Sequence, residues 1–111
     1  MPLERWSDRV VVVHLADDPT FTDDLMTFDG LIGADLVLDF GAVRHINSTN
    51  LGRLLRLRKQ AGAEGMKLVL CSVSDHVWGT FLTTSLDCLF EFSDNVPTAL
   101  ATLQMNQSTR G

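Results

Sequence analysis

The segment that decides the fold is residues 36–52, LVLDFGAVRHINSTNLG. Its first five residues, LVLDF, form a short apolar run that ends beside a carboxylate, which is typical of a buried strand. Residues 41–46 predict a loop, and Asn47 or Ser48 supplies the side chain of a helix N-cap. A strand, a loop and a capped helix in this order predict one step of an α/β fold.

The same alternation of strand and helix is predicted on both sides of this segment. Apolar and β-branched runs predict further strands at residues 10–15, 67–73 and 89–92, with a short edge strand at 3–6. Periodicity and capping residues predict helices at residues 22–32, at 48 to about 62, after Ser74 or Asp75, and after Asp94 or Asn95 with Pro97 in its first turn. The polar residues from 106 onward predict a frayed tail.

This alternation predicts the fold class and the domain organisation. We expect a single α/β domain over residues 1–111, with its core at about residues 10–104 and a polar tail at 105–111. Its sheet is expected to be mixed and mostly parallel, with four to five strands, right-handed crossovers and about four helices packed on it.

The composition is that of a globular protein and argues against a membrane-spanning segment. Of its 111 residues, 45% are hydrophobic and 21% are charged. The longest apolar runs fall far short of the roughly 20 residues that span a bilayer, and no signal-peptide pattern opens the chain. Two cysteines, Cys71 and Cys88, do not make a disulfide framework. We therefore expect a cytoplasmic protein with no direct membrane insertion.

Charge argues against nucleic acid as a partner. The net charge of −5 opposes the counterion exchange on which non-specific nucleic-acid binding depends. Four of the nine basic residues nevertheless fall in one short stretch, at Arg53, Arg56, Arg58 and Lys59. The stretch is read as a solvated helix face, with contact to an acidic partner as the alternative.

No pattern of residues predicts catalysis, a metal or a cofactor. The three histidines, His14, His45 and His76, lack metal-ligand spacing with one another and with the cysteines. The chain contains neither a glycine-rich phosphate loop nor a nucleophile elbow. Cys71 is expected to be a core residue, and Trp78 is either a core residue or an exposed anchor.

The stretch Asn47-Ser48-Thr49-Asn50-Leu51-Gly52, after a strand that ends near Asp39, resembles the signature of STAS domains. This family includes bacterial anti-sigma-factor antagonists and the C-terminal domains of sulfate transporters. Its motif reads Asp-Ser-Ser/Thr-Gly-Leu-Gly at a helix start. The element order from residue 10 to residue 103 also resembles the family.

The resemblance to the antagonist branch implies a function and its residues. Ser48 corresponds to the serine that is phosphorylated in that branch, and Thr49 is the second candidate. The implied partners are an anti-sigma factor that is also a serine kinase, and a PP2C-type phosphatase. The implied partner-binding surface comprises Asn47, Ser48, Thr49, Asn50, Leu51 and Arg53. A phosphate at a helix N-terminus gains backbone donors, yet it adds negative charge to the surface that a partner covers.

Two departures from the motif keep other functions open. Asn47 stands where the family has Asp, and Asn50 stands where it has Gly. A STAS subunit or scaffold that is not phosphorylated, as in a lipid-transport ABC system or a signalling assembly, is therefore the alternative. A small enzyme or ligand sensor that uses Asp39 and the helix N-terminus as an anion site is the third hypothesis. Asp39 is otherwise expected to bond to loop amides at the strand end.

Overall fold

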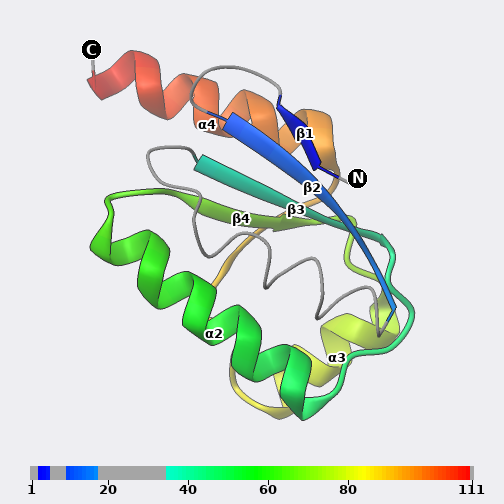
Figure 1. The fold of residues 1–111 in the computed structure, drawn as a ribbon. Coiled ribbons are helices and arrows are strands. Elements are labelled where there is room, and N and C mark those ends of the chain that lie inside the picture. Colours follow the sequence, from blue (N-terminus) through cyan, green and yellow to red (C-terminus); the bar gives the residue numbers. More distant parts are fainter. Residues whose placement is uncertain (1–2, 6–9, 18–34, 111) are drawn as a thin grey trace.

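The computed structural model describes residues 3–5, 10–17 and 35–110, which form one sheet with helices on both of its faces (Figure 1). The strands are β1 (Leu3–Arg5), β2 (Val10–Ala16), β3 (Asp35–Ala42), β4 (Leu68–Cys71) and β5 (Glu91–Ser93). The helices are α2 (Ser48–Ala63), α3 (Asp75–Thr83) and α4 (Val96–Arg110). The helix predicted at residues 22–32 lies outside the described residues.

The strands pair in the order of the sequence, β1-β2-β3-β4-β5. β1 runs antiparallel to β2, and the other three pairings are parallel. The α/β class and the mixed, mostly parallel sheet are therefore confirmed. The described residues contain five strands, of which four are parallel, and three helices. Because β2, β3, β4 and β5 run the same way, the segments that follow them gather at one edge of the sheet.

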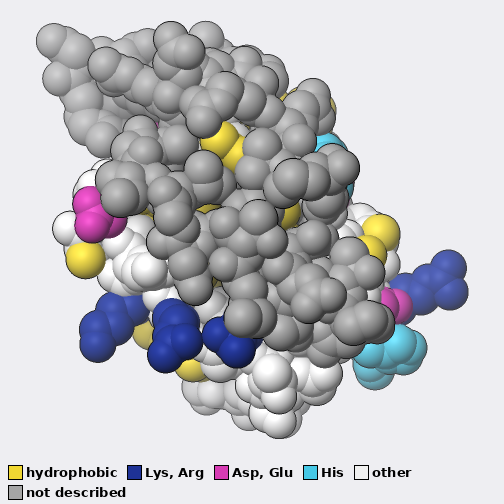
Figure 2. Space-filling view, viewed as in Figure 1, with side chains coloured by type: hydrophobic (Ala, Val, Ile, Leu, Met, Phe, Trp, Pro, Cys, Tyr) yellow, Lys and Arg dark blue, Asp and Glu magenta, His cyan; other side chains and the backbone are white. Residues whose placement is uncertain are grey.

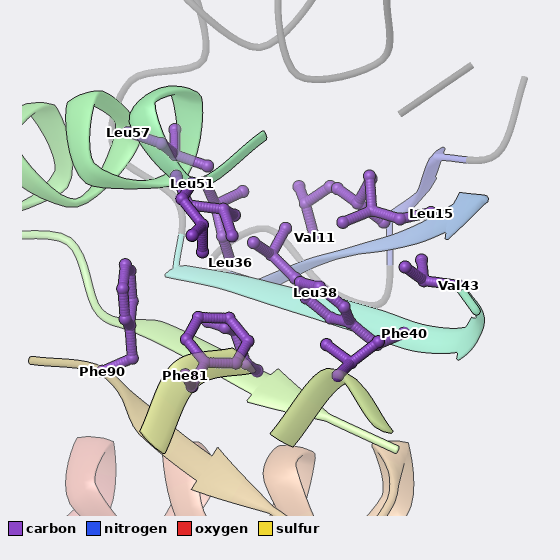
Figure 3. Close-up of a cluster of buried hydrophobic side chains, with 14 residues drawn as sticks. Val11, Leu15, Leu36, Leu38, Phe40, Val43, Leu51, Leu57, Phe81 and Phe90 are labelled. Carbon is purple, nitrogen blue, oxygen red and sulfur yellow. The ribbon is translucent and has the colours of Figure 1, made fainter. Parts of the chain in front are cut away.

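One face of the sheet packs against α2 and α3 (Figure 3). Alternate residues of β2 and β3 point to this face, as the two-residue period of a strand requires. Leu54 of α2 and Phe81 of α3 are both fully buried there, and each such side chain contributes about 1.5–3 kcal/mol. The cluster contains Val11, Val13, Leu15, Leu36, Leu38, Phe40, Val43, Leu51, Leu54, Leu57, Leu70, Val77, Phe81 and Phe90.

The other face of the sheet is covered by α4 (Figure 1). Ala99 and Leu103 of this helix pack on the intervening strand residues, which include Val37 and Cys71. The expectation that Cys71 is a core residue is confirmed, because its side chain is fully buried. Burial of both sheet faces explains why the central strands have continuous apolar sequences.

α4 continues to Arg110, through the stretch that was expected to be a frayed polar tail. The side chain of Asn95 caps the start of this helix by accepting a bond from the Thr98 N–H at 2.9 Å. Apart from Met105, residues 104–110 are polar, but polarity predicts exposure and does not by itself end a helix. Glutamine and methionine, which occur in this stretch, are favourable helix residues.

The other two helices end in the same hydrogen-bonded motif. In α2 the Met66 N–H bonds to the Ala61 carbonyl, and Gly65 adopts a left-handed φ of 71°. In α3 the Leu86 N–H bonds to the Phe81 carbonyl, and Ser85 adopts a left-handed φ of 60°. Both are Schellman motifs, in which glycine is the usual left-handed residue. The serine in α3 therefore carries backbone strain that the glycine in α2 avoids.

Candidate functional site

The start of α2 is fixed by a reciprocal pair of hydrogen bonds between two asparagines. The Asn47 side chain accepts from the Asn50 N–H at 2.8 Å, and the Asn50 side chain accepts from the Asn47 N–H at 3.1 Å. Asn47 is thus the N-cap, in extended backbone geometry, and the pair forms a capping box. The two positions that depart from the family motif are the two members of this box.

Ser48 and Thr49 lie inside the box as the first two residues of the helix, and both are exposed. Neither hydroxyl has a hydrogen-bond partner among the described residues. Capping by Ser48, the alternative to phosphorylation, does not occur, because Asn47 does the capping. The Asn50 and Leu51 amides bond to Asn47, whereas the Ser48 and Thr49 amides have no acceptor within the described chain. Two unused donors therefore flank an exposed hydroxyl.

The remaining residues of the predicted partner surface differ in exposure. Arg53 is half-buried on the next turn of α2. Asn50 is 1% exposed and Leu51 is 8% exposed, and Leu51 belongs to the core cluster under the helix. We do not retain these two residues in the surface, because a partner cannot reach their side chains. They support the surface formed by Asn47, Ser48, Thr49 and Arg53 from below.

The loop before α2 is anchored by a carboxylate that the sequence analysis did not assign to the site. Asp17, directly after β2, accepts from the Arg44 N–H at 2.8 Å and from the His45 N–H at 3.1 Å. These two backbone bonds lower the pKa of Asp17 from its usual value. The signal in the sequence was an acidic residue immediately after a buried strand, but its bonding partners come from a loop 27 and 28 residues away. The anchor fixes the loop that presents Asn47.

A histidine pair connects the same loop to α3. The rings of His45 and His76 contact edge to face, with centroids 5.6 Å apart. His76 is in the first turn of α3, so the ring contact brings that turn beside the loop before α2. Figure 2 shows histidine atoms gathered where these two elements meet. The loop and the starts of α2 and α3 consequently form one continuous surface.

β3 continues to Ala42, so Asp39 lies within the strand and not at its end as expected, and it lies on the other side of the sheet. Its neighbour Leu38 belongs to the α2 face, so strand alternation directs Asp39 toward the α4 face. Its carboxylate accepts from the Gly41 N–H at 2.9 Å and contacts Nδ1 of His14 at 2.7 Å. This placement separates Asp39 from the N-terminus of α2. It therefore does not support the anion site of the third hypothesis.

Cys71 lies beside Asp39 in the register of the sheet. Burial, together with the neighbouring Asp39 carboxylate, raises the pKa of Cys71 to about 11 from 9.0. Its Sγ donates to the Leu38 carbonyl at 3.5 Å. The thiol is therefore protonated at neutral pH and is a poor nucleophile.

The basic residues of α2 divide between structural and exposed roles. Lys and Arg side chains gather along this helix in Figure 2. Nε of Arg58 donates to the Leu89 carbonyl at 2.5 Å, which ties α2 to the segment before β5. Arg56 and Lys59 are exposed and have no ion pair within the described residues. These two residues fit the solvated helix face that their spacing predicts.

Neither a metal-binding cluster nor a helix that could cross a membrane is present in the described part of the chain. Across residues 10–17 and 35–103, no group of three or more histidine, cysteine or acidic side chains could hold a metal ion. No helix in the described part of the chain combines the length and hydrophobicity that crossing a membrane requires.

Solved structures with the same arrangement of elements include proteins of signalling and of transport. A Thermotoga maritima protein described as a candidate anti-sigma factor antagonist is 20% identical, with a TM-score of 0.79 over 93% of each chain. A chain of the stressosome, a signal integration and transduction hub, is 22% identical, with a TM-score of 0.72 over 96% of this chain and 98% of that one. A sulfate transporter family protein from Wolinella succinogenes is 20% identical, with a TM-score of 0.68 over 87% and 84%. These likenesses show the fold.

No curated protein sequence matches the chain. The STAS domain model, in contrast, matches residues 7–99, which include every described strand except β1 as well as the capped start of α2. The match therefore extends over most of the chain and agrees with the structural likenesses. The chain belongs to the STAS domain family.

Proposed function

We propose that this protein is an anti-sigma-factor antagonist, a binding module whose affinity for a partner is switched by phosphorylation of Ser48. The partner is an anti-sigma factor that is also a serine kinase, and a PP2C-type phosphatase reverses the modification. The protein acts in the cytoplasm, regulates transcription and catalyses no reaction itself. Thr49 is the second candidate for the modified residue.

The observation that carries this proposal is the geometry of Ser48. Its side chain is exposed, and its hydroxyl is not used for capping because Asn47 fills that role. The unused Ser48 and Thr49 amides and the positive end of the α2 dipole lie beside it. A phosphate on Ser48 gains these donors without breaking any hydrogen bond of the described chain.

The physical effect of the phosphate falls on the partner surface. The modification adds about −1.5 to −2 charge units to a helix end that has no acidic residue in its first turn. The fold tolerates this charge because the helix dipole favours it. A partner packed over Asn47, Ser48 and Thr49 would have to desolvate the added charge, so binding weakens while the domain stays folded.

Two of the structural relatives carry descriptions that agree with the proposed role. The Thermotoga maritima protein is described as a candidate antagonist, and the stressosome chain belongs to a signal transduction assembly. Both match almost the full length of this chain. A single small domain of this family fits a module that acts by binding.

The experiment is phosphosite mass spectrometry on the protein isolated from its native cells, with identification of the proteins that co-purify. We expect phosphate on Ser48 and a kinase-type anti-sigma factor bound to the unmodified form. Purified Ser48→Asp should bind that partner at least about tenfold more weakly than Ser48→Ala, because a charge now lies under the interface. Thr98→Asp is the matched control, because Thr98 is an exposed hydroxyl residue in the first turn of α4, outside the proposed partner surface.

Three outcomes would contradict the proposal. Ser48 could remain unmodified during growth and under stress. Ser48→Asp could bind its partner as well as the wild type does. Equal losses for Ser48→Asp and Thr98→Asp would instead show a general effect of added negative charge on binding, without a specific switch at Ser48.

The second candidate function is that of a STAS subunit or scaffold without a phosphorylation switch. The observation that favours it is the asparagine capping box, because Asn47 and Asn50 replace the Asp and Gly of the family motif. A kinase that reads the missing carboxylate would not recognise this helix start. Such a subunit should form a stable complex, for example with a transport ATPase, that Ser48→Asp leaves unchanged.

A further inference from the structure

A cavity of about 280 Å³ opens between the start of α3 and the end of β5. This volume lies just below the usual range of small-molecule sites and suits the end of one long side chain. The cavity is at the carboxyl edge of the parallel strands, the edge at which open α/β sheets commonly bind ligands. It is lined by Val73, Asp75, Trp78, Phe92, Ser93 and Asp94.

Two aromatic rings form the apolar part of the lining. Trp78 and Phe92 contact edge to face, with centroids 4.8 Å apart and planes 84° apart. Both side chains are half-buried, so their rings are held in place and still reach the cavity. The faces of such rings carry partial negative charge and attract cations, and tryptophan attracts them most strongly.

Two carboxylates supply the charged part of the lining. Asp75 and Asp94 are both exposed, and neither forms an ion pair with any residue of the described chain. The lining contains no lysine or arginine to offset them. Both carboxylates lie at helix N-termini, Asp75 in the first turn of α3 and Asp94 directly before the Asn95 cap of α4, so the helix dipoles offset part of their charge. Two carboxylates without a cationic side chain in the lining, beside two aromatic rings, are still complementary to an organic cation.

The first turn of α3 lies between the cavity and the loop before α2. Asp75 and Trp78 line the cavity from this helix, and the ring of His76, between them in the sequence, contacts His45 in the loop that presents Asn47. A protein that covers the starts of both α2 and α3 can therefore reach the cavity. We infer that the cavity receives an arginine or lysine side chain of the protein partner. The inference rests on the proposed function, and it specifies the chemistry of the partner's contact.

The test uses a probe that requires neither the partner nor a phosphate. N-acetyl-arginine methylamide is titrated into the full chain, and N-acetyl-citrulline methylamide serves as the uncharged probe of the same shape. The readout is the indole N–H signal of Trp78 by NMR, in a Trp6→Phe background that leaves Trp78 as the only tryptophan. We expect a saturable shift with the arginine probe at millimolar concentration and none with the citrulline probe.

Variants then test the charge requirement. Asp75→Asn combined with Asp94→Asn should weaken binding of the arginine probe at least about tenfold, because both negative partners are removed. Asp87→Asn, a half-buried acid outside the lining, is the matched control and should bind the probe as the wild type does. The dispersion of the NMR spectrum shows whether each variant is folded. Trp78→Leu, made in the chain that keeps Trp6, is a second variant at the aromatic wall. Because it lacks the indole signal of Trp78, binding of the arginine probe is measured from the backbone amide shifts of β5.

The outcomes separate this inference from the proposed function. Equal shifts with both probes, or binding by the double aspartate variant within about twofold of the wild type, would overturn the inference. Such a result would leave the Ser48 switch untouched, because that switch is measured with the partner and at another residue. Conversely, an unmodified Ser48 with selective binding of the arginine probe would reject the switch and support the cation site.

Discussion

The asparagine capping box provides the sharpest quantitative test of the structure. Asn47→Ala removes the acceptor of the Asn50 N–H, a bond of 2.8 Å, and the loss of such a cap costs about 1–2 kcal/mol. Asn50→Ala removes the acceptor that Asn50 supplies to the Asn47 N–H, at about 1 kcal/mol. Alanine's better helix propensity, worth up to about 0.7 kcal/mol, offsets part of this second cost. We therefore expect Asn47→Ala to be the more destabilising change.

Reciprocity predicts that the two substitutions interact. The double variant should deviate from additivity by at least about 0.5 kcal/mol, because each side chain orders the backbone that the other one contacts. Asn50→Gly introduces the glycine of the family motif, yet it should cost about 1 kcal/mol more than Asn50→Ala because glycine disfavours a helix. Asn95→Ala is the matched control for the loss of a single capping bond, since Asn95 caps α4 by accepting from the Thr98 N–H.

The assay is urea denaturation at equilibrium, followed by circular dichroism and by tryptophan fluorescence. For a domain of 111 residues, each kilocalorie per mole corresponds to a change in Tm of about 4 °C. If Asn47→Ala lies within about 0.5 kcal/mol of the wild type, the cap does not stabilise the helix. A strictly additive double variant would show that the two bonds form independently, and the argument from reciprocity would then be refuted.

Three further predictions concern the helix ends, the buried thiol and the loop anchor. Ser85→Gly should stabilise the protein by about 0.5–1 kcal/mol by relieving a left-handed serine, whereas Gly65→Ala should destabilise it by about 1 kcal/mol, both by urea denaturation. Iodoacetamide at pH 8 should label exposed Cys88 and leave buried Cys71 unlabelled until unfolding. Stability should fall between pH 9 and 11, where the Cys71 thiol ionises only in the unfolded chain. Asp17→Ala should accelerate hydrogen exchange at the two loop amides that Asp17 binds. In the wild type, the Asp17 carboxylate should contribute its full stabilisation of the fold above pH 3.8, and this contribution should be lost as the pH falls through its lowered pKa in the folded state.

Each of these predictions has a result that would contradict it. A gain in stability from Ser85→Ala as large as that from Ser85→Gly would show that relief of backbone strain is not the cause. Labelling of Cys71 at the rate of Cys88 in the folded state would mean that the α4 face opens readily. Unchanged exchange at the Arg44 and His45 amides in Asp17→Ala would mean that the loop is held by other contacts.

The fold could be predicted from the sequence because its signals are local. The run at residues 36–40 and the capping asparagine before α2 each define an element through neighbouring residues. The polar residues from 106 onward were expected to fray, but α4 extends to Arg110, because polarity indicates exposure while the capped start of the helix and its helix-favouring residues govern its length. The antiparallel edge pairing of β1 also agrees with the short strand expected there, although that strand is three residues long.

The candidate site could be predicted only in part, because its geometry depends on contacts distant in sequence. The helix start was assigned correctly, but burial of Asn50 and Leu51 depends on how α2 packs on the sheet. Asp17 and the loop amides are far apart in the chain, and no pattern of spacing joins them. The face of the sheet to which Asp39 points follows from strand register. A single residue of offset would have reversed it.

These contacts together determine what kind of switch the helix start can be. The capping box fixes the first turn of α2, and Asp17 fixes the loop before it. Both constraints act on backbone atoms and remain available when Ser48 carries a phosphate. A modification at Ser48 therefore changes the charge of a surface whose shape is already determined. We expect the partner complex to lose affinity through faster dissociation, while amide chemical shifts beyond the first turn of α2 stay unchanged.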